Sequence, residues 1–202
     1  MPGDCKIPMK QGSRDDYQTP PYALKPLLPY IPKDWVVWEC AAGKGYLSAA
    51  FIRLGYRVIS SDIITGQDFL TWEPEEHWDI IVTNPPYKYK QQFLERCYEL
   101  GKPFALLVPL TTFETPKRQT FMKKHGVQVI FFDKRINFMT PSGGGKGAWF
   151  ATAWFTNWMN LENDLNWEHL DADNKWEDYF KSLDIEDGDR MNRHRDILER
   201  FI

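Results

Sequence analysis

The sequence predicts a single α/β domain in which a mostly parallel, twisted sheet carries helices on both faces. Apolar runs of strand length recur along the chain, and several are separated by segments whose apolar residues recur three and four apart, as in a helix. Alternation of this kind is typical of a parallel sheet covered by helices. A chain of 202 residues is long enough for one well-buried domain but too short for a second large one.

The N-terminal part is expected to precede the sheet. Residues 1–18 are polar, show no apolar period and predict a flexible leader. Residues 19–32 place five prolines around an apolar stripe, which predicts a short helix ended by Pro29 and then an extended segment. This segment is expected to cap the core, and the catalytic domain is expected to span residues 19–158.

A strand, a turn, a helix and a second strand follow in order, which makes a right-handed βαβ unit. The strands are expected at 35–40, 56–62, 78–84, 104–110, 127–133 and 148–158, and the helices at 46–55 and 91–101. Residues 142–147, rich in glycine, predict either a loop that becomes ordered on a ligand or a plain connection between two strands. The remainder, 159–202, predicts an acidic tail with helical stretches at 175–183 and 195–201.

A glycine-containing turn directly follows the first predicted strand. Gly43 and Gly45 let the backbone approach a ligand closely, and the helix that begins after them offers free N–H groups. Ser48 stands where a dinucleotide fingerprint has its third glycine, so the pattern disfavours NAD. Taken alone, such a turn is a weak signal.

Two acidic residues follow the second strand. Asp62 lies 19 residues after Gly43, a separation that suits a carboxylate bound to the two hydroxyls of a ribose. Asp68 comes where the chain should pass an adenine ring and could accept a hydrogen bond from its amine. The alternatives are a turn or helix-cap aspartate at Asp62 and an exposed loop acid at Asp68.

The most specific motif is Asn84-Pro85-Pro86-Tyr87, at the end of the third strand. Two prolines stiffen the chain and exclude a helix directly after the strand. A rigid turn at this edge can direct the Asn84 amide oxygen and the Pro85 carbonyl at the two hydrogens of a planar NH2 group, while Tyr87 stacks on the ring that bears it. The alternative is an ordinary strand-ending turn.

Together these motifs resemble those of the class I, Rossmann-like amino-methyltransferases, most closely the small phage and prophage DNA adenine-N6 methyltransferases. The resemblance covers roughly residues 19–158, and Asn84, Pro85, Pro86 and Tyr87 match the family's catalytic motif. It implies S-adenosylmethionine as cofactor, bound by Thr19, Pro20, Tyr22, Glu39, Ala41, Gly43, Gly45, Asp62, Asp68 and Asn84. It also implies direct methyl transfer to the N6 of an adenine flipped out of double-stranded DNA.

The charge pattern marks a candidate nucleic-acid face. Net charge is −3 for residues 1–83, +7 for 84–147 and −7 for 148–202, and phosphate binding needs clustered Lys and Arg. The recognition region is expected within 88–147, which is small for stringent site recognition. The candidate phosphate contacts are Lys88, Lys90, Lys117, Arg118, Lys123, Lys124, Lys134, Arg135 and Lys146. The alternative is a solvated helix face.

Several other classes of protein are disfavoured. No run of 18 or more apolar residues and no cleavable leader occur in the sequence, so neither a membrane nor a secreted protein is expected. Cys5, Cys40 and Cys97 are widely spaced without a CxxC pair, which suggests neither a disulfide framework nor a metal site. The cytoplasm of a bacterial or phage-infected cell is expected.

Other functions compatible with the same residues stay open at this stage. The same turn would serve an RNA base, cytosine N4 or a protein glutamine amide, although glutamine methyltransferases usually carry an extra N-terminal helical domain. A DNA-binding relative without turnover is the alternative outside enzymes. The sequence leaves the target sequence, the oligomeric state and the role of the acidic tail undetermined.

Overall fold

The computed structural model describes residues 18–138 and 150–170. Its strands are β1 (Val36–Glu39), β2 (Arg57–Ser60), β3 (Ile80–Thr83), β4 (Phe104–Pro109), β5 (Gln128–Phe132), β6 (Thr152–Asn157) and β7 (Leu165–Glu168). Its α-helices are α1 (Tyr46–Arg53), α2 (Lys90–Leu100) and α3 (Pro116–His125), and its 3-10 helices are η1 (Pro21–Tyr30), η2 (Ile63–Thr65), η3 (Tyr87–Tyr89) and η4 (Leu110–Glu114). The expected flexible leader up to residue 17, the glycine-rich loop with Lys146 and the two helical stretches of the tail lie outside the described residues.

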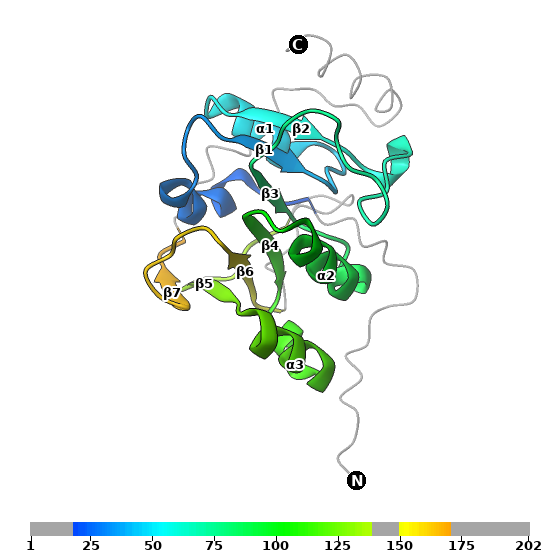
Figure 1. Cartoon of the computed structure of the whole chain (residues 1–202). Coiled ribbons are helices and arrows are strands. Elements are labelled where there is room, and N and C mark those ends of the chain that lie inside the picture. The colour runs from blue at the N-terminus through cyan, green and yellow to red at the C-terminus, as the bar shows by residue number, and fades with distance from the viewer. Residues whose placement is uncertain (1–17, 139–149, 171–202) are drawn as a thin grey trace.

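The strands form one sheet in the order β2-β1-β3-β4-β6-β5-β7 (Figure 1). Strands β2, β1, β3 and β4 are parallel neighbours. Strand β6 lies between β4 and β5 and is antiparallel to both, and β7 pairs in parallel with β5. The prediction of a mostly parallel sheet with helices is therefore confirmed.

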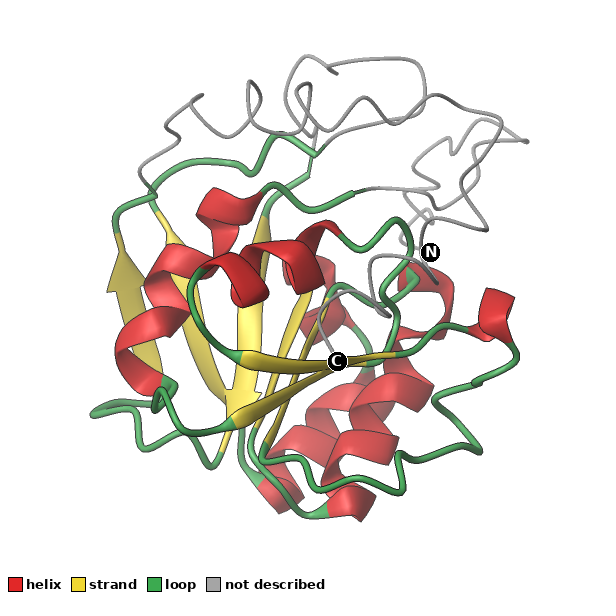
Figure 2. Ribbon diagram, turned by 90° about the horizontal axis from the view of Figure 1, so that it is seen from above, coloured by secondary structure: helices red, strands yellow, loops and turns green. Residues whose placement is uncertain are grey.

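Two apolar cores cover the two faces of the sheet, and Figure 2 shows helices on both sides of it. The alternation of side chains along a strand assigns each residue to one core. On β4, Ala105 and Leu107 face the core with η1 and α1, whereas Phe104, Leu106 and Val108 face the core with α2 and α3. Because β4 is buried on both faces, its sequence is a continuous apolar run.

The N-terminal helix is a 3-10 helix of ten residues, and it runs one residue past its expected end at Pro29. Pro26 and Pro29 lie inside it and lack an N–H group, so a regular α-helical ladder cannot form. Leu24 and Leu27 of this helix are fully buried. The buried Trp154 indole of β6 donates to the Ala23 carbonyl at 2.8 Å and attaches this helix to the sheet.

The connection from β2 to β3 holds no helix longer than η2 within residues 61–79, all of which the structure describes. Aromatic side chains cover the sheet there instead. Trp38 of β1 packs against Phe69 and Trp78, with ring centroids 5.3 and 5.1 Å apart. The Trp38 indole also donates to the Ser61 hydroxyl at 2.9 Å, which holds the end of β2 against β1.

The sheet extends beyond the domain boundary expected at residue 158. Strand β7 follows at 165–168, and Leu170 is fully buried. The burial pattern of β7 is the reverse of that expected from residue polarity. Trp167 is exposed, whereas Asn166 is buried and donates to the Asn163 carbonyl at 2.8 Å. A short edge strand whose apolar residues face solvent lacks the alternation of apolar and polar residues expected of a strand. The segment was therefore predicted to be part of the tail.

Candidate active site at the carboxyl edge of the sheet

The candidate site lies where the parallel strands end. The register pairs the end of β1 with the end of β2, and β3 lies directly between β1 and β4. The turn after β1, the acidic end of β2 and the proline turn after β3 therefore meet at one edge of the sheet. Ligands of open α/β sheets bind at this edge.

The turn after β1 depends on its two glycines. Gly43 and Gly45 have φ angles of 54° and 79°, in the left-handed region that side chains other than glycine rarely adopt. A β-carbon on Gly43 would also lie 3.2 Å from the Gln18 amide nitrogen. Backbone bonds hold the turn, because the Ala42 N–H donates to the Ser61 carbonyl at 3.1 Å.

Asp62 joins the glycine turn to the end of β2. One carboxylate oxygen accepts the Gly43 N–H at 2.9 Å, and the other accepts the Ile64 N–H at 2.9 Å. The spacing that suggested a shared ligand thus corresponds to a direct contact between the two motifs. Each carboxylate oxygen can accept a further hydrogen bond, so Asp62 remains able to bind hydroxyl groups.

Glu39, the last residue of β1, is buried with a 1% exposed surface. One carboxyl oxygen accepts from the Thr83 hydroxyl and from the Ala41 N–H, whereas Oε2 has no hydrogen-bond partner among the described residues. Burial raises the pKa of Glu39 to about 8, against the opposing effect of the two hydrogen bonds. A buried polar atom without a partner at this edge fits a polar ligand.

The turn after β3 starts at Asn84, next to the buried Thr83 that contacts Glu39. Pro85 is buried and Asn84 is half-buried, and η3 begins at Tyr87. The Tyr87 ring meets Phe150 edge-on, with centroids 5.6 Å apart and planes at 86°. The Lys90 ammonium donates to the Tyr87 carbonyl at 3.1 Å, which holds the turn against the start of α2.

Residues 19–22, three of which are expected to bind the cofactor, are buried. The Tyr22 hydroxyl accepts the Asn137 N–H at 2.8 Å, so this side chain connects the N-terminal helix to the residues after β5. Thr19 is buried, and its hydroxyl has no hydrogen-bond partner among the described residues. The structure thus gives Tyr22 a packing role and leaves Thr19 with an unused donor.

Asp68 lies in the helix-free connection after η2. Its carboxylate accepts the Leu70 N–H at 3.0 Å, and its carbonyl accepts the Trp72 N–H at 2.7 Å. These bonds are those of a turn, whereas the alternative stated for Asp68 was an exposed loop acid. Its side chain is half-buried and can accept one bond more.

Three residues of this edge are absent from the sequence-based site. Gln18 is buried, and its amide oxygen accepts the Lys44 N–H at 3.1 Å, although the sequence assigned it to the leader. Ile63 and Ile64 are 66% and 71% exposed directly after Asp62. The sequence signal that could have identified Ile63 and Ile64 is an apolar pair directly after a carboxylate. Exposed apolar side chains in that position suit an aromatic ligand ring.

The structure separates the basic residues into two groups. Lys88 follows the proline turn, and Lys134 and Arg135 follow β5, which runs parallel to β4 because both are antiparallel to β6. These three exposed residues lie at the candidate site's edge of the sheet. Lys117, at the start of α3, also lies there but pairs with Glu95 at 3.2 Å.

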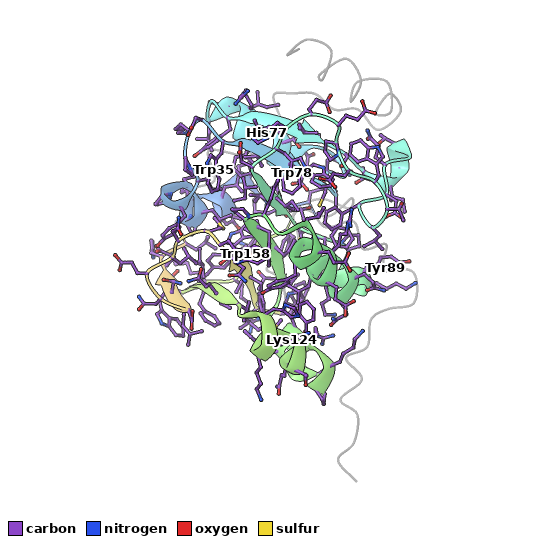
Figure 3. All side chains as sticks on the ribbon, viewed as in Figure 1. Trp35, His77, Trp78, Tyr89, Lys124 and Trp158 are labelled. Atoms are coloured by element: carbon purple, nitrogen blue, oxygen red, sulfur yellow. The ribbon has the colours of Figure 1, made fainter. Side chains whose placement is uncertain are left out.

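Lys123 and Lys124 lie at the opposite edge. They belong to the last turn of α3, whose His125 carbonyl accepts from Asn157 at 3.4 Å, and Asn157 pairs with Phe104 at the start of β4. Figure 3 marks Lys124 on α3 and Tyr89 in the turn before α2. These two lysines therefore do not join the candidate site, because α3 runs away from that edge.

Arg118 is also unsuited to the phosphate contact expected of it. Its half-buried guanidinium donates to the Thr112 and Thr111 carbonyls at 2.5 and 3.3 Å. Burial lowers the pKa of Arg118 from its usual value. The side chain thus holds η4 on α3.

Among residues 18–138 and 150–170, no helix is long and apolar enough to cross a membrane. The same residues contain no group of three or more His, Cys, Asp or Glu side chains arranged to hold a metal ion. Cys40 and Cys97 are buried free thiols.

Comparison with known proteins places the fold. No protein-family model matches the sequence, and no curated protein matches it. The structure is similar to the methyltransferase subunit of a type I restriction-modification system from Streptococcus thermophilus, with a TM-score of 0.51 and 16% identity over 76% of this chain and 47% of that chain. The chain thus spans about half the length of that subunit.

Two other solved structures are similar at lower TM-scores. A candidate RNA methyltransferase from Pyrococcus horikoshii has a TM-score of 0.46 and 17% identity over 67% of this chain and 79% of that chain. A ribosomal protein L11 methylase from Lactobacillus delbrueckii has a TM-score of 0.43 and 14% identity over 67% and 76%. The chain therefore has the Rossmann-like fold found in methyltransferases.

Proposed function

We propose that this chain is an S-adenosylmethionine-dependent methyltransferase that acts on the N6 amine of adenine in double-stranded DNA. The observation that carries the proposal is the contact between Glu39 and Thr83, which joins the cofactor turn to the start of the Asn84 turn. A cofactor-type glycine turn and an amine-binding turn thus stand side by side at the ligand edge of the sheet.

The residues of the first two strands fit a nucleoside cofactor. Asp62 offers its carboxylate to two ribose hydroxyls, and Asp68 offers one acceptor to the adenine amine. The exposed Ile63 offers an apolar surface to the adenine ring. Glu39 and Thr19 each have a buried polar atom that lacks a hydrogen-bond partner among the described residues, and these atoms fit the polar methionine end. When bound, S-adenosylmethionine supplies an electrophilic methyl group on its sulfonium.

The proline turn would hold the other reactant. Asn84 and the Pro85 carbonyl accept the two hydrogens of the amine, Pro86 keeps the turn rigid, and Tyr87 stacks on the base. Flipping a base costs a few kcal/mol, and stacking returns about 1–3 kcal/mol, so phosphate contacts supply the remainder. Alignment is then the main contribution of the protein to the rate.

Lys88, Lys134 and Arg135 are proposed as phosphate contacts, because they are exposed at the same edge as Asn84. Lys123 and Lys124 provide a matched control, since they are exposed lysines at the opposite edge. Replacing the first three by alanine should weaken duplex binding and flatten its salt dependence. Replacing the control pair should leave both nearly unchanged. The reverse result would place the DNA on the other edge.

The fold similarity agrees with a DNA substrate. The Streptococcus thermophilus protein is a subunit of a restriction-modification system, and it resembles this chain at 16% identity. The discriminating experiment supplies the purified chain with methyl-labelled S-adenosylmethionine and unmethylated duplex DNA, total RNA or soluble protein. Mass spectrometry of the digested products should find N6-methyladenine from DNA.

Each other product would change the proposal in a defined way. N4-methylcytosine, a methylated RNA base or methylglutamine would replace the substrate and keep the enzyme class. Cofactor binding without transfer to any acceptor would indicate a DNA-binding relative without turnover. Asn84→Ala should nearly abolish transfer while cofactor affinity persists, because the amide aligns the amine rather than the cofactor. Tyr87→Phe should retain most of the activity, because the π-face remains.

A further inference from the structure

Glu39 has an unusual position for a carboxyl group. It is buried at the end of β1 and contacts Thr83 at the end of β3, directly before Asn84. Its first oxygen is fully engaged by the Thr83 hydroxyl and the Ala41 N–H. Its second oxygen, Oε2, has no hydrogen-bond partner among the described residues. A buried carboxyl with one unused oxygen can receive a donor from a ligand.

The surroundings of Glu39 determine its charge before a ligand binds. Burial contributes most to raising its pKa to about 8, and the nearby Asp62 carboxylate raises it further, while the two hydrogen bonds lower it. Cys40, the other titratable group beside it, stays a neutral thiol because burial raises its own pKa strongly. Among the described residues no cation acts on Glu39, so the carboxyl is mostly protonated at pH 7.

A cation would reverse this balance. S-adenosylmethionine and S-adenosylhomocysteine both carry an α-ammonium group, and an opposite charge nearby favours the ionised carboxyl. We propose that Glu39 is a positioning residue that releases its proton to the solvent when the cofactor binds, and that Thr83 holds the resulting carboxylate in place. This inference rests on the proposed function, because it requires the cofactor site.

Proton release can be measured without turnover. Calorimetric titration with S-adenosylhomocysteine in buffers of different ionisation enthalpy gives the number of protons released. At pH 7 the wild-type protein should release about 0.9 proton, the fraction protonated for a pKa of about 8. Its affinity should rise about eightfold between pH 6.5 and 7.5 by the same relation. Glu39→Gln should remove most of the release and most of the rise.

Thr83 provides an independent test that keeps the carboxyl. Thr83→Val removes the hydroxyl that lowers the pKa of Glu39, so the pH profile of binding should move to higher pH. Thr83→Ser, which restores a hydroxyl, should return the profile toward that of the wild type. A merely structural role for Thr83 would lower affinity equally at every pH.

The possible outcomes separate the two proposals. This inference would be overturned if S-adenosylhomocysteine binds with equal proton release in the wild type and Glu39→Gln, or with no release in the wild type. The proposed function would then still stand. An unmoved profile in Thr83→Val would remove Thr83 from it. No binding by the wild-type protein would overturn the proposed function, and this inference with it.

Discussion

Replacement of Glu39 by glutamine should change how the ligand-free protein responds to pH. The folded-state pKa of Glu39, about 8, lies above its ordinary value of 4.5. A group with a raised folded-state pKa contributes stability that is fully present below the unfolded value and is lost as pH rises through the folded value. The wild-type protein should therefore lose stability between pH 4.5 and 8, whereas glutamine, which does not titrate, removes this contribution.

The size of the effect follows from the shift. Each pKa unit corresponds to about 1.4 kcal/mol, so the full window sets a ceiling of about 5 kcal/mol. Between pH 5.5 and 7.5 the same relation gives about 2 to 3 kcal/mol. With a urea m-value of about 2 kcal/mol/M, this difference corresponds to a shift of roughly 1 M in the unfolding midpoint.

Urea unfolding of both proteins at pH 5.5, 6.5 and 7.5 measures this difference directly. Other titrating groups contribute equally to the two proteins, so only the difference between the two pH profiles belongs to Glu39. The glutamine variant should gain on the wild type steadily as pH rises. Parallel profiles would refute the assignment of a buried, protonated carboxyl, whatever the absolute stabilities.

Three further changes test other parts of the structure. Asp62→Ala should reduce affinity for S-adenosylhomocysteine in calorimetry more than Asp68→Ala, because Asp62 also holds the glycine turn, and equal losses would contradict the ribose assignment. Gly43→Ala should weaken the same binding several-fold, whereas Gly55, which has a similar positive φ but open space around it, should on replacement by alanine lose only stability. Equal affinities of the two variants would exclude a close approach of the ligand to Gly43. Trp154→Phe should destabilise the protein by about 2 kcal/mol in urea unfolding, because it removes a buried hydrogen bond and leaves a cavity. A loss below about 0.5 kcal/mol would show that contacts other than this hydrogen bond attach η1 to the sheet.

The inner strands β1, β3 and β4 could be predicted from the sequence because they are buried on both faces and their ends coincide with turn residues. β4 shows this most clearly, since each of its residues is buried. The juxtaposition of Gly43, Asp62 and Asn84 followed from the parallel order alone, because such strands present their carboxyl ends at one edge. Their roles in binding and catalysis stay predictions.

Other features depended on information that a linear pattern lacks. A count of charges could not place Lys123 and Lys124, because their edge is determined by the direction of α3. Strand β7 has its apolar residues outside, so periodicity does not reveal it. Gln18 is a polar residue next to a polar leader, and only its contact with the turn after β1 shows its place.

The helix-free connection between β2 and β3 has a thermal consequence. This connection, which lies beside Asp62, is held largely by aromatic packing on Trp38 rather than by a ladder of backbone hydrogen bonds. Apolar contacts weaken on cooling. This connection should therefore loosen in the cold before the sheet does. Amide exchange at Phe69 and Trp72 should then accelerate relative to that in β4 as the temperature falls.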